Sequence, residues 1–152
     1  MTPDKTCFDF IKNHEGCKLH AYQDSAGIWT IGYGTITYED HTHVKPGDTI
    51  TQQRAEQLLE IEIIEKSKAV NAATSIVPLN QKQYNALVSF AYNAGTGALF
   101  SSTLLKRIKV NPADPSIRDA FMMWDKAHVD GNLVEVSGLK NRRNDEADLY
   151  FS

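Results

Sequence analysis

The stretch from His14 to Gly34 constrains the fold most, because the pattern of apolar residues changes around it. Over residues 3–14 apolar residues recur at helical spacing, and a proline near the start suits a first helical turn. Residues 24–27 (Asp-Ser-Ala-Gly) predict a turn, and residues 28–33 (Ile-Trp-Thr-Ile-Gly-Tyr) are rich in strand formers. The sequence therefore predicts a helix followed by a small, glycine-rich β region of about three strands.

The β region ends where a long helix is predicted. Residues 35–38 predict a partner strand, and residues 45–48 (Lys-Pro-Gly-Asp) predict a further turn. Thr51 can cap a helix that runs to about Ala73, and Ile61 and Ile64 lie off its main apolar stripe. A helix that is apolar on more than one side is typical of one that bridges two lobes, and equally of one wedged in a core.

The remainder of the chain predicts helices with recognisable starts. Asn80 with Gln83 resembles a capping pair, and Asp114-Pro115 predicts a cap followed by a proline in the first turn. Asp130-Gly131 predicts the tight turn of a hairpin, and a last helix begins near Leu139. The chain is therefore predicted to be an α+β protein, mostly helical with one small early sheet.

Composition narrows the function classes. A length of 152 residues suits one domain, and 16 basic against 19 acidic residues give a net charge of −3, which argues against general nucleic-acid binding. Cys7 and Cys17 make no disulfide framework, and we expect two reduced packing residues rather than a redox switch. Basic groups could still form a local patch, from Lys106, Arg107 and Lys109 or from Lys140, Arg142 and Arg143.

Targeting signals are not evident in the sequence. No apolar run approaches the length of a membrane span, and the first residues, Met-Thr-Pro-Asp-Lys-Thr-Cys, lack the apolar core of a signal peptide. We therefore expect no membrane insertion, and a protein that is made and kept in the cytoplasm until something else releases it.

Three polar residues suggest a catalytic cleft: Glu15 at a helix end, Asp24 in a turn and Thr30 on a strand. Glycoside hydrolysis needs one protonated carboxyl group for the leaving oxygen and one charged carboxylate to activate water or attack the sugar. Glu15 suits the acid because a helix C-terminus disfavours negative charge, whereas backbone N–H groups in a turn can stabilise an ionised Asp24. Thr30 can share the hydrogen bonding of a water held by Asp24. The spacing alone is weak, since each residue also has an ordinary structural interpretation.

The context of these residues is more specific. Together with Leu19, Ala21-Tyr22, Gly27 and Thr30-Ile-Gly-Tyr-Gly34, the segment from Glu15-Gly16 resembles the phage-type lysozymes, the endolysins of glycoside hydrolase family 24. Later landmarks in the same order extend the resemblance over essentially the whole chain: Phe90-Ala-Tyr-Asn-Ala-Gly95, Ser102-Thr103-Leu104-Leu105, Trp124 and Gly138-Leu-Lys-Asn-Arg-Arg143.

The resemblance implies a lysozyme-like fold, with a small N-terminal β lobe and a larger helical lobe joined by a long helix. It implies one catalytic domain over 1–152, with the β lobe at about 16–50, the linking helix at about 51–73, and the helical lobe at about 74–152 plus the N-terminal helix at about 3–14. That architecture favours the lobe-bridging interpretation of the helix that begins at Thr51.

The resemblance also implies an activity. The family cleaves the β-1,4 bond between N-acetylmuramic acid and N-acetylglucosamine in peptidoglycan without a metal or cofactor. By this comparison Glu15 is the general acid, Asp24 positions the attacking water and Thr30 assists, so hydrolysis with inversion is expected. A lytic transglycosylase and a non-catalytic glycan-binding or particle-associated module are the alternatives. The implied partners are glycan strands and a holin for release, and we expect a monomer.

Further residues match family positions. Tyr92, Asn93 and Thr103 are candidates for lining the sugar-binding cleft, although a core tyrosine, a helix-end cap and a helix start would explain them equally well. Arg142 resembles an arginine that pairs with the catalytic glutamate, which would favour a charged Glu15 and oppose the helix-end effect. Thr35 departs from the family, where many members have His, and this leaves a structural His–carboxylate pair in doubt.

Overall fold

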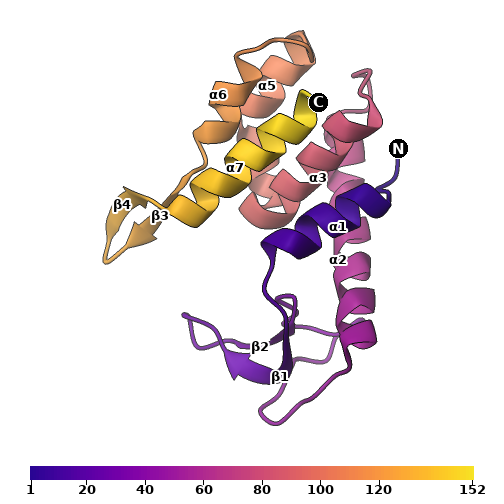
Figure 1. Cartoon of the computed structure of the whole chain (residues 1–152), viewed down its shortest axis with the longest axis vertical. Coiled ribbons are helices and arrows are strands. Elements are labelled where there is room, and N and C mark those ends of the chain that lie inside the picture. The colour runs from indigo at the N-terminus through magenta and orange to yellow at the C-terminus, as the bar shows by residue number, and fades with distance from the viewer. The chain divides into compact units, whose positions relative to one another are not determined.

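The computed structural model describes residues 1–152 and forms two compact units (Figure 1). One unit comprises Phe8–Glu65, and the other combines Met1–Cys7 with Lys66–Ser152. None of the helices has both the length and the apolar character that crossing a bilayer demands.

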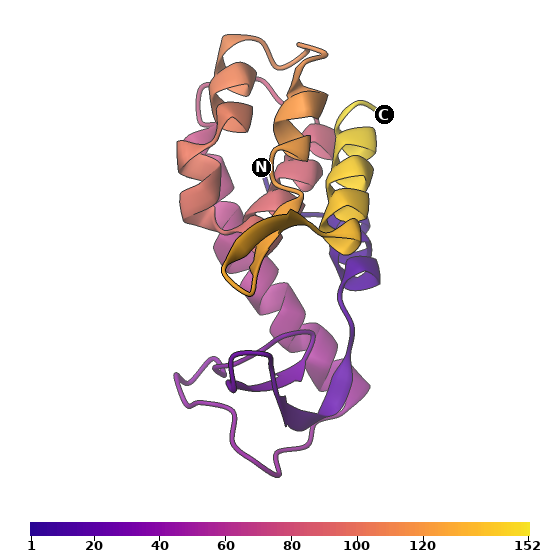
Figure 2. The same ribbon diagram turned by 90° about the vertical axis from the view of Figure 1, so that its left-hand side faces the viewer.

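A two-stranded antiparallel sheet forms in the first unit. Strand β1 (Lys18–Gln23) pairs with β2 (Trp29–Gly32), with Tyr22 opposite Thr30 and an irregular register between Lys18 and Tyr22. The predicted third strand at 35–38 is wrong as a continuous strand. Gly32 and Gly34 have φ of 65° and 103°, so the chain turns at once and Thr35 bridges back to Ile31. Beyond this point, wide loops with isolated bridges follow (Figure 2).

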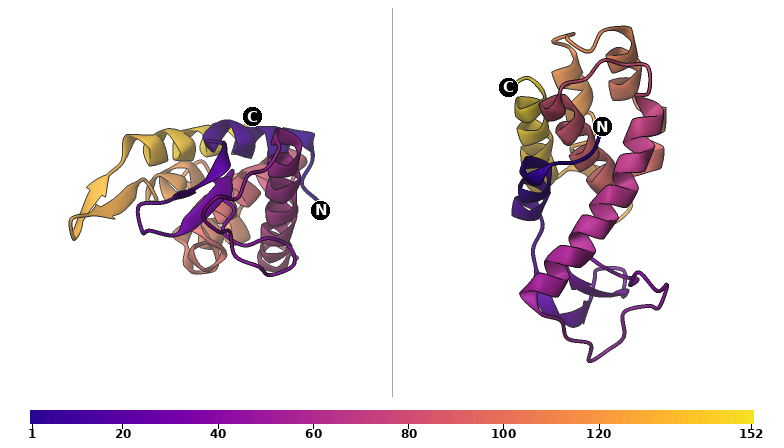
Figure 3. Two further views of the ribbon diagram at one scale, coloured as in Figure 1. Left: turned by 90° about the horizontal axis from the view of Figure 1, so that it is seen from below. Right: turned by 90° about the vertical axis from the view of Figure 1, so that its right-hand side faces the viewer.

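Two helices belong partly to each unit. Helix α1 (Lys5–His14) begins two residues later than predicted, and Asp4 accepts the backbone N–H of Cys7 at 3.1 Å in its first turn. Helix α2 (Gln52–Ala73) is one uninterrupted coil (Figure 3), and the predicted cap is confirmed because Thr51 Oγ1 accepts the N–H of Arg54 at 3.1 Å. Its main stripe is buried at Ala55, Leu58, Leu59, Ile63 and Val70, whereas Ile61 and Ile64 stay 45% and 48% exposed.

Helix α3 (Gln81–Ala94) is the central element of the second unit, where residues 84–91 are all buried. The predicted capping box is confirmed: Asn80 Oδ1 accepts the N–H of Gln83 at 2.8 Å, and Gln83 Oε1 accepts that of Asn80 at 3.0 Å. α3 packs beside α7 (Figure 1). The other elements of this unit are α4 (Thr96–Ser101), α5 (Thr103–Val110), α6 (Ile117–Met122), β3 (Lys126–Val129), β4 (Asn132–Glu135) and α7 (Ser137–Tyr150).

Aromatic rings hold α3 against its neighbours. Phe90 meets Phe121 and Trp124 edge-on, with ring centroids 6.0 and 5.8 Å apart, and Phe121 meets Tyr150 at 5.9 Å. Such edge-to-face geometries are favourable for aromatic pairs, so this cluster fixes α3, α6 and α7 relative to one another.

The start of α6 differs from the prediction. Asp114 Oδ1 accepts the N–H of Ser116 at 2.8 Å, and the Asp114 carbonyl accepts that of Ile117 at 3.1 Å. These bonds close a tight turn over 114–117, so the helix begins at Ile117 rather than at the proline. The predicted hairpin turn is confirmed, with φ of 51° at Asp130 and 80° at Gly131, and the β3–β4 hairpin extends away from the helices of its unit (Figures 1 and 3).

Candidate functional site

Glu15 lies at the C-terminal end of α1, as predicted. Its backbone N–H still donates to the carbonyls of Ile11, at 3.1 Å, and Lys12, at 3.3 Å, so the residue closes the last helical turn. The side chain is half-buried. The position combines a fixed backbone with a side chain that is partly exposed.

Asp24 organises the turn between β1 and β2. Its Oδ1 atom accepts the N–H groups of Ala26 at 2.8 Å and Ile28 at 2.9 Å, and its own N–H donates to the Ile28 carbonyl at 2.9 Å. Gly27, with φ of 81°, allows the chain to double back. The predicted backbone stabilisation of this carboxylate is therefore present, and it fixes the orientation of the side chain.

Thr30 is 4% exposed, and its hydroxyl donates to the Ile28 carbonyl at 2.9 Å. Because a hydroxyl has one proton and two lone pairs, Oγ1 is left with acceptor capacity only. The threonine is therefore oriented by its own backbone neighbourhood before any ligand arrives.

Asp24 and Thr30 are both bonded to Ile28: Asp24 Oδ1 accepts the Ile28 N–H at 2.9 Å, and Thr30 Oγ1 donates to the Ile28 carbonyl at 2.9 Å. In the strand register Tyr22 is opposite Thr30, and Asp24 directly follows the end of β1. Lys18 Nζ lies 4.2 Å from the centre of the Tyr22 ring, which adds positive charge to this part of the sheet.

A buried group of charged and polar side chains joins α3 to α7. Glu146 is fully buried; its Oε1 lies 2.7 Å from Arg143 Nε as an ion pair, and its Oε2 accepts the Ser89 hydroxyl at 2.5 Å. Arg142 contributes Nε at 3.5 Å from Glu146 Oε2 and Nη2 at 3.3 Å from Ser89 Oγ. Burial raises the pKa of the Glu146 carboxyl, and the adjacent guanidinium groups and the Ser89 hydroxyl oppose this. Two cations thus share one carboxylate.

The residues predicted to line the sugar cleft lie at the ends of helices in the second unit. Tyr92 and Asn93 are in the last turn of α3, half-buried and exposed respectively, and Thr103 is the first residue of α5. Arg143 Nη2 donates to Asn93 Oδ1 at 2.6 Å. The buried cluster therefore reaches one predicted site residue directly.

Sequence reasoning misjudged α7. The basic patch predicted from Lys140, Arg142 and Arg143 is wrong, since the two arginines are 4% and 1% exposed. Ser89 and Glu146 were not anticipated at all. The spacing within α7 could have indicated Glu146, because it follows Arg143 by three residues and Arg142 by four, the spacing at which helical side chains meet. The predicted pairing of Arg142 with Glu15 stays a prediction.

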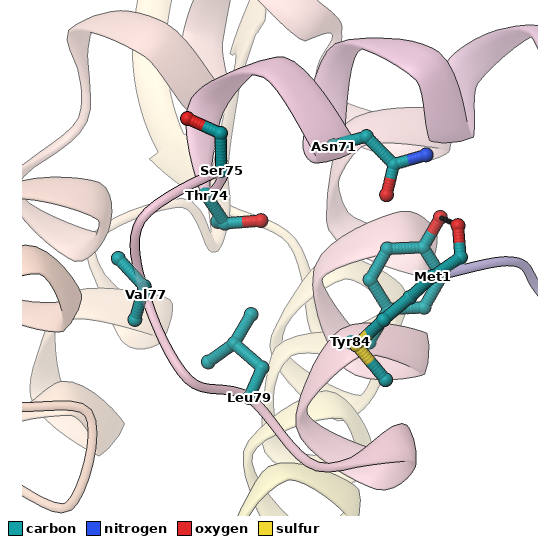
Figure 4. Close-up of a pocket in the computed structure, with 7 residues that line it drawn as sticks. All are labelled: Met1, Asn71, Thr74, Ser75, Val77, Leu79 and Tyr84. Carbon is teal, nitrogen blue, oxygen red and sulfur yellow. Dashed lines mark hydrogen bonds between the residues drawn. The ribbon is translucent and has the colours of Figure 1, made fainter.

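Cys17 is a half-buried free thiol with Sγ 3.6 Å from Gln52 Oε1, and burial raises its pKa. A pocket of about 210 Å³ opens beside the end of α2, lined by Asn71, Thr74 and Tyr84 among others (Figure 4). The Tyr84 hydroxyl there donates to the Met1 carbonyl at 3.2 Å, and the lining includes none of the predicted site residues. No cluster of three or more His, Cys, Asp or Glu side chains is arranged to hold a metal ion.

Comparison with known proteins identifies the family of this chain. The model of the family described as phage lysozyme matches residues 12–146. The chain belongs to the phage lysozyme family. The endolysin of Acyrthosiphon pisum secondary endosymbiont phage 1 is 41% identical over 143 residues, 93% of this chain and 92% of that protein. The endolysin of Salmonella phage P22 is 37% identical over 142 residues, with the same two coverages.

Solved structures agree with this membership. The endolysin from Escherichia coli O157:H7 phage FAHEc1 has a TM-score of 0.90 and 44% identity, covering 99% of this chain and 93% of that one. The fold is therefore that of the phage lysozymes: an α+β protein with a small N-terminal β lobe and a larger helical lobe joined by a long helix.

Proposed function

We propose that this phage lysozyme is an endolysin that hydrolyses the β-1,4 bond between N-acetylmuramic acid and N-acetylglucosamine in bacterial peptidoglycan, leading to lysis of the host cell. Its endolysin relatives support the substrate. The observation that carries the chemistry is the arrangement of the Asp24 turn beside Thr30, with Glu15 on the preceding helix. Residues 1–152 would form one catalytic domain.

Asp24 and Thr30 suit the capture of one water molecule. Thr30 Oγ1 can only accept, because its proton is directed to the Ile28 carbonyl, and Asp24 Oδ1 is held by two backbone amides. The second Asp24 oxygen and Thr30 Oγ1 can each accept one proton of the same water. A water that donates both protons has its lone pairs free for the anomeric carbon.

Glu15 would donate the proton that the leaving sugar oxygen needs. Its place at the end of α1, half-buried and fixed by two backbone hydrogen bonds, supports a defined position for that proton. With a water activated by a second carboxylate on the opposite face of the sugar, the reaction inverts the anomeric configuration. Tyr92, Asn93 and Thr103 would contact the glycan, and Arg142 would support Glu15.

The decisive experiment compares Glu15→Gln with the parent in the clearing of purified cell walls. Positioned acids contribute about 10²- to 10⁴-fold to rate, so we expect a loss of that size. Glu60→Gln, at an exposed glutamate of α2, is the matched control and should clear walls like the parent. Equal clearing by Glu15→Gln and the parent would refute Glu15 as the acid.

The digest identifies the reaction class. Mass spectrometry of the released fragments should find reducing ends, whereas 1,6-anhydro ends would mean a lytic transglycosylase. A parent that binds walls without cleaving them would mean a glycan-binding module. Proton NMR of the first product formed should detect the inverted anomer.

We also propose a monomer that is made in the host cytoplasm and gains access to the wall through a separate membrane-permeabilising partner of the holin type. Size-exclusion chromatography with light scattering tests the monomer. Expression alone should leave host cells intact until chloroform permeabilises the inner membrane. Lysis without any permeabilising treatment would contradict this route.

A further inference from the structure

Asn93 is an exposed residue tied to a buried one. It sits in the last turn of α3, and its Oδ1 atom accepts a hydrogen bond of 2.6 Å from Arg143 Nη2. Arg143 is 1% exposed, so its guanidinium group cannot turn to solvent for other partners. The side-chain amide of Asn93 is therefore held by the buried guanidinium group of Arg143.

The chemistry of the two groups decides which way the amide faces. A guanidinium group carries N–H donors and no acceptor, and an asparagine side chain has one oxygen acceptor and one NH₂ donor. Only Oδ1 can face Arg143, because the reverse orientation would bring two donors together at 2.6 Å. The Nδ2 group consequently points away from α7.

Arg143 is itself immobilised on several sides. Its Nε lies 2.7 Å from Glu146 Oε1, its Nη2 donates to Glu146 Oε2 at 3.3 Å, and its Cζ lies 5.0 Å from the centre of the Phe90 ring. Ser89 in turn binds Glu146 at 2.5 Å. These contacts fix the guanidinium plane, so the orientation of Asn93 is set before a ligand arrives.

We propose that Arg143 is a positioning residue that makes Asn93 a donor-only contact, which selects an acetamido carbonyl oxygen of the glycan. This inference rests on the proposed function, since it takes Asn93 to contact the sugar strand. A carbonyl oxygen only accepts, so it matches Nδ2, whereas the ammonium group of a de-N-acetylated sugar only donates and is rejected. The site would thereby bind an N-acetylated sugar in preference to a de-N-acetylated sugar at this position.

Binding to the Glu15→Gln variant tests the proposal without turnover. The probes are an N-acetylglucosamine oligosaccharide and its fully de-N-acetylated counterpart, measured by calorimetry. Asn93→Asp keeps the oxygen that faces Arg143 and replaces the outward donor by an acceptor. We expect it to weaken binding of the acetylated probe about three- to tenfold, the value of one hydrogen bond, and to strengthen binding of the other.

Asn141→Asp, at an exposed position of α7, controls for added negative charge and should leave the ratio of the two affinities closer to that of the parent. An unchanged ratio in Asn93→Asp would overturn the proposal. So would a Glu15→Gln protein that binds neither probe although the parent clears cell walls. Failure of the parent to cleave walls would instead overturn the proposed function.

Substitution of Arg143 tests whether this residue orients the Asn93 amide or only supports the fold around it. Arg143→Gln offers both a donor and an acceptor, so the Asn93 amide can flip and the preference for the acetylated probe should fall. Arg143→Lys offers donors only and should restore the preference. Circular dichroism checks that both are folded. Parent-like preference in folded Arg143→Gln would contradict the proposal, and the Asn93→Asp result decides if that variant does not fold.

Discussion

Replacing Thr30 with valine should separate catalysis from stability. The two side chains have nearly the same shape, and only valine lacks the hydroxyl that would hold one proton of the attacking water. We expect kcat on cell walls to fall by about 10- to 100-fold, since each factor of ten is about 1.4 kcal/mol in the barrier and one or two hydrogen-bond equivalents are lost. KM should stay near that of the parent, because in the proposed mechanism the hydroxyl would contact the water rather than the sugar.

The stability change should be small, for reasons visible around Thr30. Valine removes the 2.9 Å hydrogen bond to the Ile28 carbonyl, a loss of about 1 kcal/mol. That carbonyl still accepts the Asp24 N–H at 2.9 Å, so it is not left unsatisfied. Valine also suits a strand and a site that is 4% exposed, which offsets part of the loss. The midpoint of urea unfolding should therefore move little.

Thr30→Ser is the matched control, since it keeps the hydroxyl and loses a methyl group. It should retain most of the parent kcat while losing some stability to the missing methyl. The reasoning is refuted if Thr30→Val keeps the parent kcat, or if the serine variant is as slow as the valine variant while both are folded.

Three further outcomes follow from contacts elsewhere. Asn80→Ala should cost about 1 kcal/mol and lower Tm by about 2–4 °C. Lys82→Ala, at an exposed position in the first turn of the same helix, should cost less than about 0.5 kcal/mol, and equal costs would contradict the capping argument. Hydrogen bonds from the Lys45 N–H and the Tyr38 hydroxyl lower the pKa of Asp48. The ionised carboxylate therefore stabilises the fold fully above its ordinary pKa of 3.8, and this stabilisation is lost as pH falls through the lower native value. Acid unfolding of Asp48→Asn should accordingly depend less steeply on pH. Burial raises the pKa of Cys7 to about 12. A thiol reagent at pH near 8 should therefore label half-buried Cys17 in the native protein, and Cys7 only after unfolding. Rapid labelling of both thiols in the native protein would contradict the burial of Cys7.

Local signals in the sequence predicted the elements that local chemistry controls. Thr51 and Asn80 cap their helices because a side-chain oxygen three residues upstream is all that the amide requires. The turn at Asp24 follows for the same reason, and the turn at Asp130-Gly131 forms because both residues readily adopt positive φ. These features depend on neighbours in sequence, so no knowledge of the tertiary structure was needed.

Features that depend on distant partners were missed or misplaced. Arg142 and Arg143 were considered for a possible basic patch. Their burial could not be predicted, because it requires Glu146 beside them and Ser89 from a helix about fifty residues away. Residues 35–38 were assigned to a strand because their residue types favour one. The positive φ angles of Gly32 and Gly34 instead turn the chain before a strand can form. Asp114-Pro115 carries a valid helix-start pattern, but its side chain closes a turn instead.

The order of the elements along the chain gives the buried charges a consequence for synthesis. α3, with Ser89 and Asn93, leaves the ribosome well before α7, which brings Arg143 and Glu146 together within one helical turn. Neither charge therefore has to be buried alone while the other is still being made. Until α7 is made, α3 lacks one of the helices that cover its apolar residues, and Asn93 lacks the cation that orients it. A nascent chain thus acquires this part of its proposed binding surface only after α7 has been made, so a chain that stops before α7 would lack it.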